Sequence, residues 1–157
     1  MKSSILAELE AARLVFHALL DSLSEEDLQR ASANPAWSNR QILFHMLFGF
    51  LLLPSLLGIA LIFSRLPSSY SRRFAALLNR LEKPFNVINA LGPQGGGRVF
   101  TRQGLRSSFD WVHTLMMKWV QALPEAELQR GMYYPARWDP LFRDYMTIAE
   151  ILRFPMR

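Results

Sequence analysis

The octet Leu23-Ser24-Glu25-Glu26-Asp27-Leu28-Gln29-Arg30 recurs 100 residues later as Leu123-Pro124-Glu125-Ala126-Glu127-Leu128-Gln129-Arg130, with five identical residues in eight. Each octet ends a segment whose apolar residues are spaced by three and four, as on one face of a helix. The two apolar faces are also displaced by 100 residues. The first consists of Ile5, Leu9, Ala12, Phe16, Leu19, Leu20 and Leu23. The second consists of Leu105, Phe109, Val112, Met116, Trp119, Val120 and Leu123. The sequence therefore predicts an internal repeat whose units begin with an amphipathic helix.

A second helix is predicted after each octet. Trp37 precedes a capping box formed by Ser38 and Gln41, and the second link carries Trp138 and then a capping box. The residues of this second box are Thr147 and Glu150. We predict an all-α fold, a four-helix bundle of two pseudo-repeated helix–link–helix halves in a single domain over residues 1–157.

Residues 67–100 lie between the two halves and form an extra helical insertion. A helix is predicted over residues 68–91, with an apolar face and a basic face, and Pro84 should bend or break it. The following stretch, Gly92-Pro93-Gln94-Gly95-Gly96-Gly97, is rich in residues that disfavour helices. We interpret that stretch as a loop.

The composition excludes several classes of protein. The 157 residues contain 18 Lys and Arg and 13 Asp and Glu, which is a net charge of +5, and half of the residues are hydrophobic. This apolar fraction is too high for a disordered chain. The chain has no cysteine, which excludes disulfide scaffolds, cysteine-ligated zinc and thiol nucleophiles. Any metal must then be bound by nitrogen and oxygen ligands.

The second predicted helix raises the question of a membrane. Met46 to Phe63 is an uncharged run of eighteen residues, which meets the length of a membrane-spanning candidate. Pro54 and Gly58 interrupt this run, and we expect a kink near Pro54. A helix buried at the centre of a bundle fits the same pattern. The sequence leaves both interpretations open, so a membrane partner is not excluded.

The three histidines differ in their settings. His17 lies away from the apolar face of the first helix, and we expect it to be solvated. His113 lies at the edge of the corresponding face and is expected to be an ordinary boundary residue. His45 lies two turns into a capped, otherwise apolar helix, where an imidazole must be hydrogen-bonded or metal-bound. From spacing alone, a hydrogen-bonded core histidine is the favoured interpretation.

The motif Trp37-Ser38-x-x-Gln41-Ile42-Leu43-x-His45, preceded by Leu-Ser-Glu-Glu-Asp-Leu, resembles the DinB-like (YfiT-like) superfamily, and so does the repeated helix–link–helix layout. The resemblance implies an up-down-down-up bundle, a homodimer, and a divalent metal (Zn, Ni, Mn or Fe) held by three histidines. One of these histidines lies on the second helix and two on the fourth. Members of this superfamily include thiol-dependent transferases and proteins assigned as metal-dependent hydrolases.

Carried over to this chain, the resemblance assigns His45 as the metal ligand on the second helix. The two ligands on the fourth helix have no match, because only eleven residues, Thr147 to Arg157, are present where that helix is expected. We expect the fourth helix to be truncated at its C-terminal end, with no tight metal site in the monomer. Glu150 is predicted to be a helix cap and not a ligand.

Three other patterns are interpreted as structural. Gly95-Gly96-Gly97-Arg98 lacks the ending of a phosphate-binding loop, and a Ser–Asp–His arrangement on the 103–122 helix lacks an oxyanion feature. The aromatic link Met132 to Trp138 is expected to close one end of the bundle. The basic residues match no nucleic-acid-binding module, so no nucleic-acid partner is expected.

Two functions stay open at this point. The first is a metal-dependent hydrolase or thiol-dependent transferase acting on a small molecule, inactive in the truncated form, with a low-molecular-weight thiol as a candidate partner. The second is a non-enzymatic helical interaction module, membrane-associated through residues 46–63. No secretory signal is visible at the N-terminus, and we expect a cytoplasmic protein. Catalytic residues are not assigned.

Overall fold

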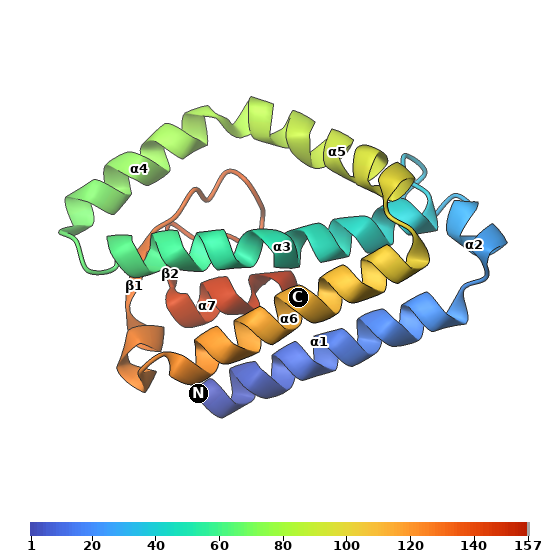
Figure 1. The fold of residues 1–157 in the computed structure, drawn as a ribbon. Helices are drawn as coiled ribbons and strands as arrows, with labels where there is room; N and C mark the ends of the chain where they lie inside the picture. The colour runs from blue at the N-terminus through green and yellow to red at the C-terminus, as the bar shows by residue number, and fades with distance from the viewer. Residues whose placement is uncertain (157) are drawn as a thin grey trace.

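Four helices form the bundle in the computed structural model, which describes residues 1–156: α1 (Lys2–Ser22), α3 (Asn39–Phe63), α6 (Arg102–Ala122) and α7 (Ile148–Arg153). Helices α1 and α7 run in one direction and α3 and α6 in the other, which is the up-down-down-up order (Figure 1). A 3₁₀ turn, η2 (Phe154–Met156), follows α7. The predicted all-α bundle is confirmed.

The internal repeat is visible in the core. Five pairs of residues displaced by 100 positions are all at most 1 % exposed, and they are Ile5 and Leu105, Leu9 and Phe109, Phe16 and Met116, Leu20 and Val120, and Leu28 and Leu128. The octets form equivalent short helices, α2 (Glu25–Gln29) and the 3₁₀ helix η1 (Glu125–Gln129). The Phe16 and Phe109 rings stack with their centroids 4.2 Å apart, which joins the two halves across the core.

The links after the octets differ in length and in structure. In the second half, β1 (Gly131–Tyr133) pairs antiparallel with β2 (Tyr145–Thr147). In the first half the equivalent pairing is a single bridge between Ala31 and Ser38. The small sheet was not predicted from the sequence, because its strands have only three residues each and no alternation long enough to detect.

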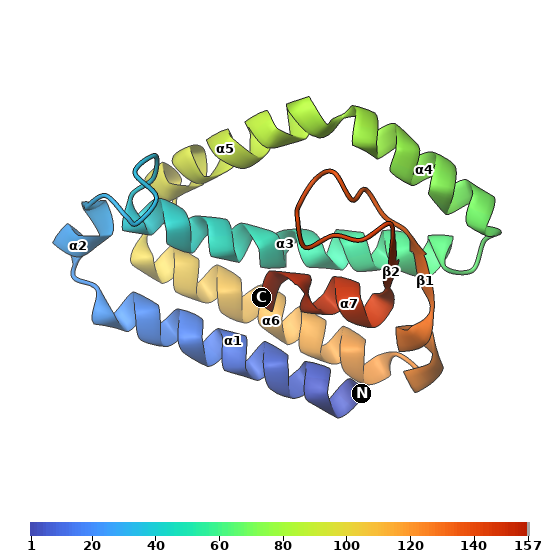
Figure 2. The ribbon, with the colours of Figure 1, turned by 180° about the vertical axis from the view of Figure 1, so that it is seen from behind.

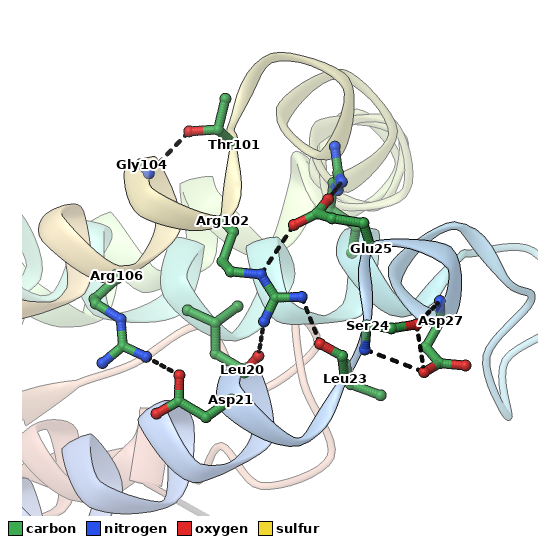
Figure 3. A network of polar contacts seen from close by, with 11 residues as sticks. Leu20, Asp21, Leu23, Ser24, Glu25, Asp27, Thr101, Arg102, Gly104 and Arg106 are labelled. Carbon is green, nitrogen blue, oxygen red and sulfur yellow. Dashed lines mark hydrogen bonds and ion pairs between the residues drawn. The ribbon is translucent and has the colours of Figure 1, made fainter.

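Contacts around the first octet (Leu23–Arg30) join α1, α3 and α6 at one end of the bundle. Arg102, the first residue of α6, donates to the carbonyl oxygens of Leu20 and Leu23 at the end of α1 (Figure 3). Its Nε also donates to Glu25 Oε1 at 2.9 Å, and the other oxygen of that carboxylate accepts from Arg40 of α3 at 2.7 Å. Arg102 thereby satisfies carbonyl groups that the end of an α-helix leaves without intrahelical partners.

Helix α3 lies at the centre of the molecule and runs through Pro54 as one element, so the expected kink does not divide it. Leu47, Leu57 and Ala60 are fully buried, and α3 contacts α5, α6 and α7. Among the described residues, α3 is the one helix that is long and apolar enough to cross a membrane. Of the residues in its most apolar window, 28 % are buried within the structure.

The insertion forms an arch over α3, made of α4 (Ser68–Arg80) and α5 (Glu82–Val99) (Figures 1 and 2). The predicted break near Pro84 is confirmed, because the two helices meet at Leu81. The prediction of a loop at Gly92–Gly97 was wrong, since these residues continue α5.

The reason for this difference is close packing on α3. A Cβ at Gly97 would lie 2.5 Å from Gln41 Cγ, and one at Gly96 would overlap the ring of Phe44. Glycines let the two backbones approach each other, and this tertiary contact overrides the low helix propensity of glycine.

Candidate functional site

The candidate site is built around His45, on the second turn of α3. The predicted capping box is present: the Ser38 hydroxyl accepts from the Gln41 N–H, and the Gln41 side chain accepts from the Ser38 N–H at 2.8 Å. The preceding link is closed by a hydrogen bond from Ser32 N to Trp37 O at 2.9 Å. This link presents the Trp37 ring to His45, with the ring centroids 5.0 Å apart.

The His45 imidazole is half-buried and its Nδ1 atom is inaccessible to solvent. Within residues 1–156 this nitrogen has no hydrogen-bond partner. Burial lowers the pKa of His45 below its usual 6.5, and the negative charge of Asp139 opposes this shift. The imidazole is therefore neutral near pH 7, which is the form that binds a metal.

The described residues do not complete a three-ligand metal centre. No group of three or more His, Cys, Asp or Glu side chains that could hold a metal occurs in residues 1–156. Asp139 is positioned by its own loop, since its Oδ1 accepts from Leu141 N at 2.8 Å. His45 thus fits the role of a metal ligand, but the donor set around it does not fit a complete centre.

The prediction for Glu150 is confirmed. Its carboxylate accepts from the Thr147 N–H at 2.9 Å, and its own N–H donates to the Thr147 hydroxyl at 3.2 Å, which is the capping box of α7. Arg143 also contacts this carboxylate at 3.1 Å. Glu150 therefore caps α7, as predicted.

The two tryptophans of the links have different roles. Trp37 lies against His45, whereas Trp138 stacks on Phe85 of α5 with the centroids 4.1 Å apart. The Trp138 indole N–H also donates to Leu78 O of α4 at 2.8 Å. Trp138 therefore packs against α4 and α5, whereas the aromatic link was predicted to close one end of the bundle. The charge of the next residue, Asp139, acts on His45.

A groove of about 470 Å³ lies between α1 and α3, beyond the end of α7. Most of its lining is apolar, with Ala11 and Val15 of α1 and Met46 and Phe50 of α3 on its two sides and Pro155 at one end. His45 does not line it. The groove therefore offers apolar contact and contributes no donor to the His45 site.

Sequence reasoning missed a polar cluster between α1 and α6. His17 was expected to be solvated, but its side chain is only 15 % exposed, and its Nε2 lies 2.9 Å from Asp110 Oδ1. His113, expected at a boundary, is 7 % exposed, and its Nε2 lies 3.2 Å from Glu10 Oε2. Arg13 contacts both carboxylates, at 2.6 Å from Glu10 and 3.7 Å from Asp110.

The charges of this cluster are matched. The hydrogen bond from Arg13 lowers the pKa of Glu10, and burial lowers the pKa of His113 although the Glu10 charge opposes it. A signal for the cluster was present in the sequence, since Glu10, Arg13 and His17 have helical spacing. A complementary set, Arg106, Asp110 and His113, lies on α6 with similar spacing. With a guanidinium between its carboxylates, the cluster is a structural ion-pair network.

The fold and the His45 position define a class of protein, a helical bundle built from two related halves with a histidine early in the second helix. The family model described as the DinB superfamily matches residues 8–155. The chain belongs to the DinB superfamily. Searches of curated proteins and of solved structures found no match.

Proposed function

We propose that this chain is the helical bundle of a metal-dependent hydrolase or thiol-dependent transferase, in which His45 supplies one metal ligand. The observation that carries the proposal is the buried His45 Nδ1, which lacks a partner among the described residues. An unpartnered buried polar atom costs about 1–3 kcal/mol, so a protein retains one where something else satisfies the imidazole. Membership of the DinB superfamily, which is generally metal-associated, supports the same assignment.

The chemistry proposed for His45 is limited to what this chain provides. A neutral imidazole beside the Trp37 ring binds a divalent cation through a lone pair, with the aromatic ring restricting its rotation. A metal that hydrolyses a substrate or activates a thiol takes about three protein ligands. Within residues 1–156 of one copy no group of three such ligands occurs. We propose a homodimer as the assembly in which a second copy contributes.

The experiment is a calorimetric titration of Zn²⁺ and of Ni²⁺ into the purified chain, with its oligomeric state measured by light scattering. The expected result is weak binding that is lost in His45→Ala and retained in His17→Ala, which removes an imidazole already engaged by Asp110. Binding that is unchanged in His45→Ala would refute the proposal. The substrate is expected to be a small molecule, with a low-molecular-weight thiol in the case of a transferase.

A second candidate, a non-enzymatic helical interaction module, is favoured by the incomplete donor set. In this alternative His45 is a core residue and not a ligand. Association with a membrane through residues 46–63 belongs to it, because α3 has the required length and hydropathy. The titration distinguishes the two candidates, since the module binds neither metal through His45.

A further inference from the structure

Helix α5 buries small residues and exposes large apolar ones, the opposite of an ordinary bundle helix. Its buried residues are Pro93 and Gly97, and a third small residue, Gly96, also packs on α3. Several large aliphatic side chains of α5 are exposed instead, among them Val87 at 56 %, Ile88 at 60 %, Leu91 at 56 % and Val99 at 78 %. A surface helix usually buries such side chains, so this face is built to contact something else.

Helix α4 also exposes large apolar side chains. Tyr70, Leu77 and Leu81 are separated by seven and four residues, which places them on one stripe of the helix. Each of the three is between 45 % and 55 % exposed. The inner side of α4 packs through Ser71 and Ala75. The apolar arc of α4 is therefore wider than the part that the core covers.

Basic residues border this stripe. Residues 65–99 contain six Lys and Arg and one acidic residue, Glu82, which is a net charge of +5. The other 122 residues contain twelve basic and twelve acidic residues, so the whole net charge of the chain lies in this segment. Four exposed cations form no salt bridge with another described residue, and they are Arg73, Arg80, Lys83 and Arg98.

The surface that these residues form is called here the arch face, and it consists of Tyr70, Leu77, Leu81, Val87, Ile88, Leu91, Arg73, Arg80, Lys83 and Arg98. The arch is convex outward, with the junction of α4 and α5 at its crest, so the arch face is the most prominent part of that side of the molecule (Figure 1). Nothing from elsewhere in the described chain covers it, since α4 and α5 form the outer layer (Figures 1 and 2).

We propose that the arch face binds the surface of an anionic lipid bilayer. Aliphatic side chains flanked by Lys and Arg are the composition of an interfacial helix, which buries its apolar face at the headgroup boundary while its cations contact anionic lipid. The cations border the apolar stripe, so their long side chains reach the headgroups as the stripe inserts. Nucleic acid is disfavoured as the partner, because Tyr70 is the one aromatic residue of the arch face and cannot provide a series of stacked bases.

The binding test uses two kinds of vesicle, one of phosphatidylcholine and one of equal parts phosphatidylcholine and phosphatidylserine. The expected result is co-sedimentation with the anionic vesicles alone, weakened by added salt. The double variant Arg73→Gln, Arg80→Gln should bind about 25-fold more weakly, at about fivefold for each charge removed. A matched control, Arg30→Gln with Lys118→Gln, removes the same charge elsewhere and should change binding far less.

A second variant tests the apolar stripe. Ile88→Ser with Leu91→Ser should reduce binding to anionic vesicles more than tenfold, because both side chains lose the area that they bury in lipid. Both positions are exposed in the isolated chain, so the variant should fold, as circular dichroism can verify. Equal binding by this variant and the wild type would overturn the proposal, as would equal binding to the two kinds of vesicle.

The absence of cysteine allows the orientation to be measured with single labels. An environment-sensitive fluorophore is attached to Ile88→Cys on the arch face, to Leu14→Cys on α1, or to Leu52→Cys on α3. Anionic vesicles should shift the emission of the label at position 88 to the blue and leave the other two unchanged. A shift at position 52 would assign the contact to α3, and a lipid-independent shift at position 88 that grows with protein concentration would assign the arch face to a dimer. Either result overturns the proposal.

Discussion

Replacing Gly96 with alanine tests whether the glycine-rich segment is a helix packed against α3. The added methyl group would overlap the ring of Phe44, which is 7 % exposed and contacts the rings of Phe48 and Phe100, with centroids 6.1 and 5.1 Å away. A shift of this ring would disturb both aromatic contacts, so overpacking should cost about 1–3 kcal/mol. The higher helix propensity of alanine returns about 1 kcal/mol, which leaves a net loss of up to about 2 kcal/mol.

Gly95 is the matched control, because a Cβ there meets no atom within 4 Å. Gly95→Ala should therefore stabilise the protein by about 0.5–1 kcal/mol if the segment is helical. The assay is urea unfolding followed by circular dichroism, in which the two variants should move the midpoint in opposite directions at constant slope. Two variants that both leave the midpoint unchanged would refute a packed helix and restore the interpretation of this segment as a loop.

Two further predictions concern stability. Arg102→Ala should lower the free energy of unfolding by about 1–3 kcal/mol, because it leaves the carbonyl oxygens of Leu20 and Leu23 without their donor. The control Arg30→Ala, which removes exposed ion pairs with Glu26 and Asp27, should cost less than about 1 kcal/mol, and equal losses in urea unfolding would contradict the capping role. Acid should destabilise the protein as the pH falls below about 6.5, because burial lowers the pKa of His113 and the unfolded chain then binds more protons than the folded one. His113→Gln should reduce this loss of stability. A variant whose stability depends on pH as that of the wild type does would contradict the reasoning.

The repeat made most of the bundle predictable. Residues displaced by 100 positions share helical spacing, and the same displacement places Leu28 and Leu128 in the core. Two members of the predicted apolar faces are nevertheless exposed, Leu19 at 41 % and Trp119 at 38 %. Periodicity indicates which side of a helix is apolar. The width of the face that is buried depends on which other elements pack against the helix, and that is set by the tertiary structure.

The insertion was only partly predictable for the same reason. Local propensity disfavours a helix at Gly95, Gly96 and Gly97, and the decisive contact is with Gln41 and Phe44, more than fifty residues away. The cluster of His17 and His113 was missed because each helix was considered alone. Considered as a pair of neighbouring helices, α1 and α6 carry complementary charges at matching intervals.

The sequence singled out one residue of the candidate site, His45, and its role as a metal ligand stays a prediction. The capped helix and Trp37 place His45 as expected, and the structure adds the unpartnered Nδ1 and the proximity of the Asp139 charge. The sequence contained no signal for Asp139, because it approaches His45 through a loop whose position depends on the contact between Trp138 and the arch. Irregular loops of this kind have no periodicity from which a position can be derived.

The most direct test of the functional account is histidine-selective NMR of the chain, which has three histidines that can be assigned by substitution. Zn²⁺ is added at neutral pH to the wild type and to His45→Ala. The account predicts that the ring nitrogens of His45 shift on metal binding, while those of His17 and His113, which face Asp110 and Glu10, do not. A shift at His17 or His113 with none at His45, or no shift at any histidine, would contradict it.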